Sequence, residues 1–159
     1  MKNWFKKITG NKNEASFDDK LNELLTSMIE ICLEYVKYDK TEIAMTYAHG
    51  SLEDSISFDY VYEIDGRFAE RHTINDFTVA NYDTSDEMQL KVLRVGIDDM
   101  TALSELFKSD NRQVPTHIII GYNNKSGEFK SKFFYDAMLG EQDMADDITL
   151  SLIEKLMKD

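Results

Sequence analysis

The chain has 159 residues, with 30 Asp and Glu against 18 Lys and Arg, so its formal net charge is −12 at pH 7. This length predicts one domain, and an apolar content of 42% is enough for a hydrophobic core, which excludes a largely disordered chain. The acidic balance argues against general nucleic-acid binding, because like charge repels phosphate, and favours a basic partner. No apolar run approaches the ~20 residues of a membrane span, and no apolar secretory segment follows Met1, which predicts a cytoplasmic protein.

The start of the chain differs in charge from the rest. Its first 13 residues hold four lysines and no acid, and they end in a polar stretch typical of a linker. We therefore expect a basic leader over 1–15 and a single domain over 16–159. The leader has two interpretations, a peripheral anchor for a membrane or partner, or a loosely ordered tail. The anchor interpretation depends on three apolar residues that share a face at helical spacing: Trp4, Phe5 and Ile8.

The first helix is predicted from Ser16 to Val36. Ser16 with Asp19 three residues later is a variant of the capping box, and apolar residues follow at steps of three and four. Cys32 lies within this apolar stripe, which favours a small buried hydrophobe over a reactive thiol. As the single cysteine it excludes an internal disulfide. The stripe consists of Leu21, Leu24, Leu25, Met28, Ile29, Cys32, Tyr35 and Val36.

Three strands are expected next. Apolar residues alternate with smaller or polar ones over 43–47 and again, with many aromatic rings, over 56–64. Asp65 and Gly66 then supply the positive-φ positions of a type I′ turn, and the chain returns as a strand over 67–74. The two-residue turn sets the register. The expected pairs are Tyr62 with Ala69, Tyr60 with Arg71, and Asp59 with His72.

A second long helix follows. Thr84 with Glu87 is another capping box, and the apolar pattern continues to Phe107. Gly96 lies near the middle of this helix and is expected to weaken or bend it. Pro115 blocks further helix.

The last part of the chain predicts two more strands and a helix. An apolar strand covers 116–120, a turn covers 123–127, a strand with alternating aromatics covers 129–135, and a helix covers 144–157. The order is α-β-β-β-α-β-β-α. This order predicts an α+β fold in which an antiparallel sheet of five strands is covered on one face by helices.

Motifs for chemistry are missing from the sequence. It contains no glycine-rich phosphate loop, no GxSxG nucleophile elbow and no HExxH zinc motif. We therefore expect no catalytic residue, no cofactor and no bound metal. One alternative is a metal site built from the three histidines, which lie far apart on or beside predicted strands, although such histidines are usually structural or exposed. These are His49, His72 and His117.

Acidic residues offer a surface for a basic partner. Asp59 and Glu63 face away from the aromatic stripe of their strand, and Glu70 joins them from the next strand. If helices cover the aromatic face, this second face is open, either as an ordinary solvated surface or as a docking surface. Two further acidic pairs are candidates for a partner surface: Glu53-Asp54 begins a strand, and Asp98-Asp99 lies mid-helix, where it has no capping role. The predicted contact set is Asp54, Asp59, Glu63, Glu70, Asp98 and Asp99.

The chain resembles the YezG-like immunity proteins over 17–140. The similar features are the opening helix, the strand over 42–48, the aromatic strand ending at Tyr62, the long central helix, and the hairpin over 127–136 with its Gly-x-Phe and Tyr-Asp. Members of this family neutralise polymorphic toxins of Gram-positive bacteria, several of them secreted nucleases, and supply no catalytic residues.

The resemblance implies an intracellular antitoxin that binds and masks a basic toxin domain. Nuclease toxins are basic because they hold phosphates, so an acidic inhibitor competes with nucleic acid for the same surface and gains association rate. Two other hypotheses remain. One is a non-catalytic adaptor that uses the basic leader, and the other is an enzyme that uses acidic residues and a divalent metal.

Overall fold

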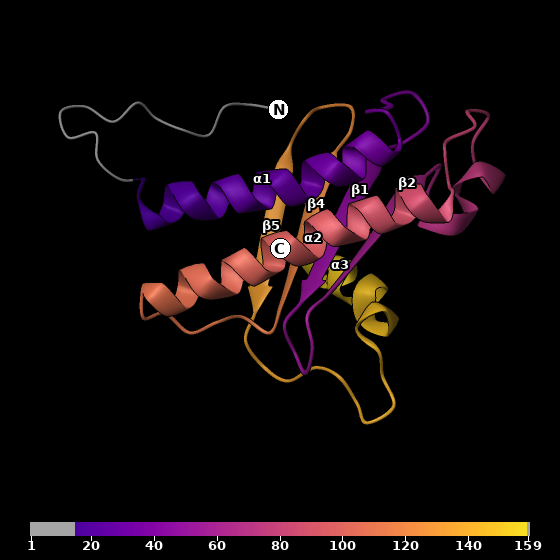
Figure 1. Ribbon diagram of the computed structural model, residues 1–159. Helices are drawn as coiled ribbons and strands as arrows, with labels where there is room; N and C mark the ends of the chain where they lie inside the picture. The colour runs from indigo at the N-terminus through magenta and orange to yellow at the C-terminus, as the bar shows by residue number, and fades with distance from the viewer. Residues whose placement is uncertain (1–14, 159) are drawn as a thin grey trace.

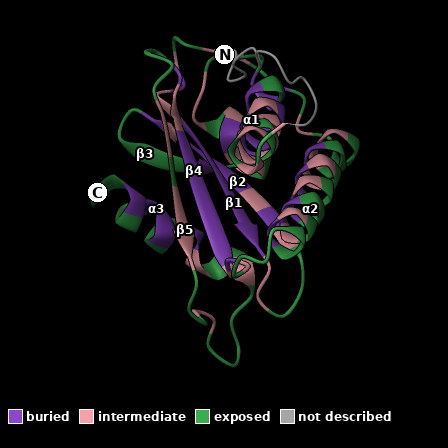
Figure 2. Cartoon of the chain, turned by 90° about the vertical axis from the view of Figure 1, so that its left-hand side faces the viewer, coloured by how far each residue is buried: buried purple, intermediate pink, exposed green. Residues whose placement is uncertain are grey.

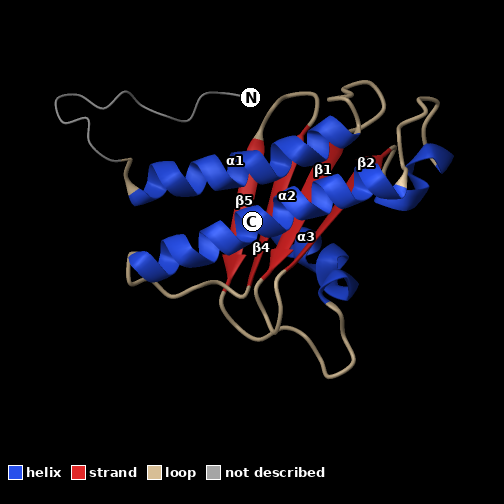
Figure 3. Cartoon of the chain, in the orientation of Figure 1, coloured by secondary structure: helices blue, strands red, loops and turns tan. Residues whose placement is uncertain are grey.

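The computed structural model describes residues 15–158 and has the expected α+β class and element order (Figure 1, Figure 3). The leader over 1–14, with its anchor interpretation, lies outside the described residues. Two short 3₁₀ helices, η1 and η2, add to the expected elements. The elements are α1 (Phe17–Tyr35), β1 (Met45–Ser51), β2 (Ser57–Ile64), β3 (Arg67–Glu70), η1 (Arg71–Asp76), α2 (Asp86–Ser109), β4 (His117–Asn123), β5 (Phe129–Phe134), η2 (Ala145–Ile148) and α3 (Thr149–Lys158).

The five strands form one antiparallel sheet in the order β3-β2-β1-β4-β5. Hairpins join β1 to β2, β2 to β3, and β4 to β5, whereas the β1–β4 pair joins the two halves of the chain. In this register Tyr47 of β1 lies opposite Val61 on one side and Gly121 on the other. Because side chains alternate between faces along a strand, the register decides which residues meet across the sheet.

Helices α1 and α2 lie on one face of the sheet and bury its aromatic side (Figure 2). Tyr35 of α1 packs edge-on against Tyr60 of β2, with ring centroids 5.1 Å apart. Helix α2 runs unbroken through Gly96, where an added Cβ would lie 2.2 Å from the ring of Phe58. Gly96 therefore lets α2 approach the sheet closely. Cys32 is fully buried in this core, as the sequence predicts.

Helix α3 lies on the opposite face of the sheet, so the helices are divided between two faces and not gathered on one (Figure 2). It packs on an apolar patch of three neighbouring strands, Tyr47 of β1, Val61 of β2 and Ile119 of β4. Such a patch favours a covering element, because burial of apolar surface is stabilising. The helix contributes Leu152, Ile153 and Leu156.

The third strand is shorter than the sequence predicts. The expected pair of Tyr62 with Ala69 is confirmed, but β3 ends at Glu70, and the chain then turns into η1. The predicted strand to Ile74 is therefore wrong, and so are the pairings of Tyr60 with Arg71 and of Asp59 with His72. The turn buries the Ile74 side chain in the core, which compensates for the lost strand pairing.

The helix starts confirm one capping prediction and correct another. Ser16 accepts a hydrogen bond from the backbone N–H of Asp19 at 3.1 Å, as expected. Helix α2 begins one residue later than predicted, with Ser85 as its cap and not Thr84. The Ser85 hydroxyl accepts from the N–H of Met88 at 3.2 Å. Both residue types cap well, so the sequence alone did not separate them.

Candidate functional site: an acidic groove beside a buried histidine pair

A groove of about 470 Å³ lies between β2, β3 and the start of α3. Strand β3 is an edge strand, so the groove opens at the border of the sheet. The apolar part of its wall comes from Val61, Phe68 and Leu150. The acidic part comes from four carboxylates, which are Asp59, Glu70, Asp146 and Asp147. This combination suits a basic side chain with an aliphatic stem.

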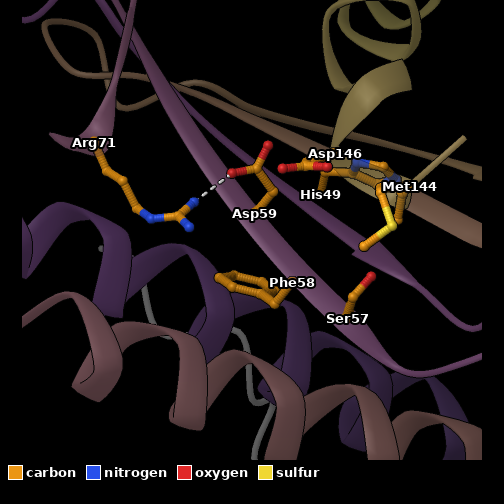
Figure 4. A pocket seen from close by; sticks show the side chains of 8 residues that line it. His49, Ser57, Phe58, Asp59, Arg71, Met144 and Asp146 are labelled. Carbon is orange, nitrogen blue, oxygen red and sulfur yellow. Dashed lines mark hydrogen bonds and ion pairs between the residues drawn. The ribbon is translucent and has the colours of Figure 1, made fainter. Parts of the chain in front are cut away.

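A smaller pocket of about 170 Å³ adjoins the groove and shares Asp59 and Asp146 with it (Figure 4). The Arg71 guanidinium reaches the Asp59 carboxylate, with Nη1 2.7 Å from Oδ1, while Asp146 and His49 lie on the other side of that carboxylate in this view. The Arg71 guanidinium also lies 5.3 Å from the centre of the Tyr60 ring, which adds a cation–π contact. The chain therefore supplies its own cation to Asp59.

Asp59 occupies a partly desolvated position. Burial raises the pKa of its carboxyl, against the lowering effects of the hydrogen bond from Thr149 and the charge of Arg71. Its Oδ2 accepts from the Thr149 hydroxyl at 2.9 Å, and its Oδ1 accepts from the N–H of Tyr60 at 2.9 Å. Because its oxygens are occupied within the chain, Asp59 is a fixed element of the groove and not a free surface charge.

A chain of hydrogen bonds continues from Asp59 through the interior. The Thr149 Oγ1 lies 2.8 Å from Nδ1 of His49, whose Nε2 lies 3.0 Å from Nδ1 of His117. The Nε2 of His117 lies 2.8 Å from Oε1 of Glu53. Thr149, His49 and His117 are all buried, so this polar chain crosses the face of the sheet beneath α3. Below, "the polar chain" means Asp59, Thr149, His49, His117 and Glu53.

Two groups of the polar chain have shifted pKa values with identifiable causes. Burial, and then the neighbouring His117, lower the pKa of His49 to about 3. For Glu53, burial opposes ionisation, but hydrogen bonds from the backbone of Met138, from His117 and from the backbone of Leu139 outweigh it and lower the pKa. Glu53 is therefore an ionised end of the polar chain.

The sequence placed His49 and His117 on or beside strands, but it did not show that these two side chains contact each other. His49 and His117 are 68 residues apart, and they meet because β1 pairs with β4 in a register that puts Ser51 opposite His117. His49 and His117 then project from the same face of adjacent strands. The signal available beforehand was their position on predicted strands. His72, in contrast, is exposed and its Nε2 lies 3.5 Å from Glu70.

The histidines do not assemble into a metal site. Both ring nitrogens of His49 and of His117 already face hydrogen-bond partners within the polar chain. Over residues 15–158, no group of three or more His, Cys, Asp or Glu side chains is placed to hold a metal ion.

The six predicted contact residues divide between two faces. Asp59, Glu63 and Glu70 lie on the α3 side of the sheet, where Glu63 is half-buried and Glu70 is exposed. Asp54 is exposed in the loop before β2, with φ of +63°.

Asp98 and Asp99 lie on α2, on the other side of the sheet. Asp98 is exposed, but Asp99 accepts a hydrogen bond from the Ser27 hydroxyl at 2.6 Å, and burial raises the pKa of its carboxyl. Asp99 therefore helps to join α1 to α2. Asp146 and Asp147 are not in the predicted contact set, and only the position of η2, directly before α3, brings them into the same groove as Glu70.

Comparison of the chain with models of known families and with curated proteins gave no match. Among the described helices, none is long and apolar enough to cross a membrane.

Proposed function

We propose that this protein is a non-catalytic immunity protein that binds and masks a basic toxin domain. The observation that carries the proposal is the acidic groove between β3 and α3, with Glu70, Asp146 and Asp147 beside the apolar side chains of Phe68 and Leu150. The wider charge supports it, since residues 15–158 hold 28 Asp and Glu against 14 Lys and Arg.

The groove combines the two features that a protein-binding site needs. Phe68 and Leu150 are 42% and 51% exposed, which gives a partner apolar surface to bury. The surrounding carboxylates select a cationic partner, and an Arg or Lys side chain can lay its stem on the Phe68 ring while its head meets a carboxylate.

The net charge of the protein supports rapid capture of such a partner. An acidic surface steers a basic protein toward it and raises the association rate, up to ~10⁸–10⁹ M⁻¹s⁻¹ at low salt. A nuclease domain fits this chemistry because it must be basic where it holds phosphates. In this proposal the protein acts inside the cell by covering that surface, and no bond is made or broken.

The test is capture followed by rescue. The protein is used as bait in lysate of the producing cell, a captured basic protein is expressed alone, and growth is compared with and without the bait protein. We expect the captured protein to inhibit growth, and co-expression to restore growth. A captured protein that leaves growth unaffected when expressed alone would contradict the immunity role.

A pair of matched charge reversals tests the groove itself. Glu70→Lys with Asp146→Lys is expected to lower affinity at least tenfold, mainly through a slower association rate. Glu23→Lys with Glu105→Lys changes the net charge equally on the exposed surfaces of α1 and α2 and is the control. If the control weakens binding as much as the groove variant, net charge and not the groove determines recognition. Circular dichroism verifies that both variants fold.

A further inference from the structure

The polar chain contains more hydrogen-bonded contacts than its neutral groups have protons to fill. It has four contacts: Glu53 to His117, His117 to His49, His49 to Thr149, and Thr149 to Asp59. Each contact needs one hydrogen between its two heavy atoms. Two neutral imidazoles and one hydroxyl supply three hydrogens, and ionised carboxylates supply none. With both carboxylates ionised and both rings neutral, one contact would bring two lone pairs together.

One additional proton completes all four contacts. It can lie on His117, on His49, on Oδ2 of Asp59 or on Oε1 of Glu53, and the hydrogen bonds reverse direction according to its position. The lowered pKa values of His49 and of Glu53 disfavour the proton at those two positions.

The surroundings of the polar chain suit this proton count. Arg71 of η1 lies against Asp59, and Asp146 of η2 acts on it from the groove side. From the opposite face of the sheet, the buried Cys32 thiol is the titratable group that interacts with Asp59. With one additional proton, the polar chain carries a charge of −1, which the Arg71 guanidinium balances.

We infer that the folded protein keeps one proton in the polar chain at neutral pH, and that this proton fastens α3 and the segment before it to the sheet. Thr149 is the first residue of α3, so its two hydrogen bonds hold one end of the 138–149 segment. Glu53 accepts from the backbone N–H groups of Met138 and Leu139, at 2.9 and 3.2 Å, and holds the other end. The inference concerns the interior of the protein and does not depend on the proposed function.

The sign of the pH dependence follows from proton linkage. At pH 7 and above the unfolded chain has ionised carboxyls and mostly neutral histidines, so it lacks the additional proton that the folded chain keeps. The additional proton therefore stabilises the folded protein at neutral pH. Its contribution to the free energy of unfolding falls as pH rises, until the folded chain releases the proton. The unfolding equilibrium constant rises by up to tenfold per pH unit over that range. Below the ordinary pKa of histidine, near 6.5, the unfolded chain binds more protons and stability falls again.

Nitrogen-15 NMR of the imidazole rings tests the inference on the unmodified protein. At pH 7 we expect either three ring protons shared by His49 and His117, or two ring protons with a protonated Asp59 carboxyl in the carbon-13 spectrum. The exposed His72 supplies an internal reference for a simple titration. Two ring protons in total, with Asp59 and Glu53 both ionised at pH 7, would overturn the inference.

A second measurement uses the pH dependence of unfolding between pH 7 and 9. Thr149→Val removes two contacts, and the two that remain are filled by two neutral imidazoles, so the additional proton is no longer needed. Thr149→Ser keeps the hydroxyl, so we expect it to keep the part of the pH dependence of the unfolding free energy that the additional proton causes. We expect Thr149→Val to lose that part. Titration of the buried Cys32 contributes equally to all variants and cancels in the comparison. Equal slopes in the wild type, Thr149→Val and Thr149→Ser would overturn the inference.

Amide hydrogen exchange locates the effect in the structure. After correction for the intrinsic rate at each pH, protection of 138–158 is expected to fall between pH 7 and 9 relative to that of α1. A parallel change in α1 and α3 would contradict the role of the proton in fastening this segment.

Discussion

The two faces of the sheet are stabilised in different ways. The face beneath α1 and α2 is a continuous apolar and aromatic core, whereas the face beneath α3 combines a small apolar cluster with the polar chain. Strand β4 contributes to both, since Ile118 points to the large core and Ile119 to the small one, each fully buried. The large face supplies most of the apolar burial, and the small face brings ionisable groups together next to the groove.

The largest expected loss of stability comes from truncating Ile118 and Ile119, the neighbours in β4, to alanine. Ile118→Ala leaves a cavity between the sheet and two long helices, and we expect it to cost about 2–5 kcal/mol of unfolding free energy. Ile119→Ala should cost less within that range, because α3 has only ten residues and can shift into the space. Urea unfolding followed by circular dichroism measures both. Equal costs would mean that α3 is held as rigidly as α1 and α2.

Removing the charge at the end of the polar chain is the next test. Glu53→Gln removes the negative charge that faces the Nε2 of His117, and it puts an NH₂ group in place of one of the two oxygens that accept from the N–H of Leu139, which we expect to cost about 1–3 kcal/mol. Asp54→Asn is the matched control, because Asp54 is exposed and Asn tolerates its positive φ. The control is expected to stay within about 0.5 kcal/mol of the wild type. A Glu53→Gln protein as stable as the control would show that Glu53 does not anchor the α3 face.

Gly96 tests how closely the large face is packed. In an open helix Gly→Ala would stabilise by about 1 kcal/mol, but here the new Cβ meets the Phe58 ring. We expect Gly96→Ala to destabilise the protein by about 1–3 kcal/mol. Adding Phe58→Leu should reduce the cost of the alanine, as a double-mutant cycle measures. A more stable Gly96→Ala protein would show that α2 does not need this close approach.

The smallest expected effect separates two ways of starting a helix. Helix α2 is capped by its own flanking Ser85, whereas the first hydroxyl of α3, on Thr149, bonds across the sheet. Ser85→Ala should cost about 1 kcal/mol, and Thr84→Ala should fall within about 0.5 kcal/mol of the wild type. Thermal unfolding compares them, and a larger loss for Thr84→Ala would restore Thr84 as the cap.

Local periodicity made much of this fold predictable. The apolar steps of three and four gave α1, alternation gave the aromatic strand β2, and Asp65 with Gly66 gave the turn that the structure confirms with positive φ at both residues. These features depend on residues within one turn or one strand of each other. The prediction failed over 71–74, where burial of Ile74 and the ion pair of Arg71 with Asp59 outweighed strand pairing.

The sequence by itself determined the helices and most of the strands, because their patterns act over a few residues, and it also determined the acidic charge. Only the tertiary structure decided that α3 covers the second face and that Asp146 lines the same groove as Glu70. It also decided that His49 meets His117, through a β1–β4 register formed by residues far apart in the chain. A strand pattern states which side chains share a face, but which element covers that face depends on the burial gained by the whole assembly.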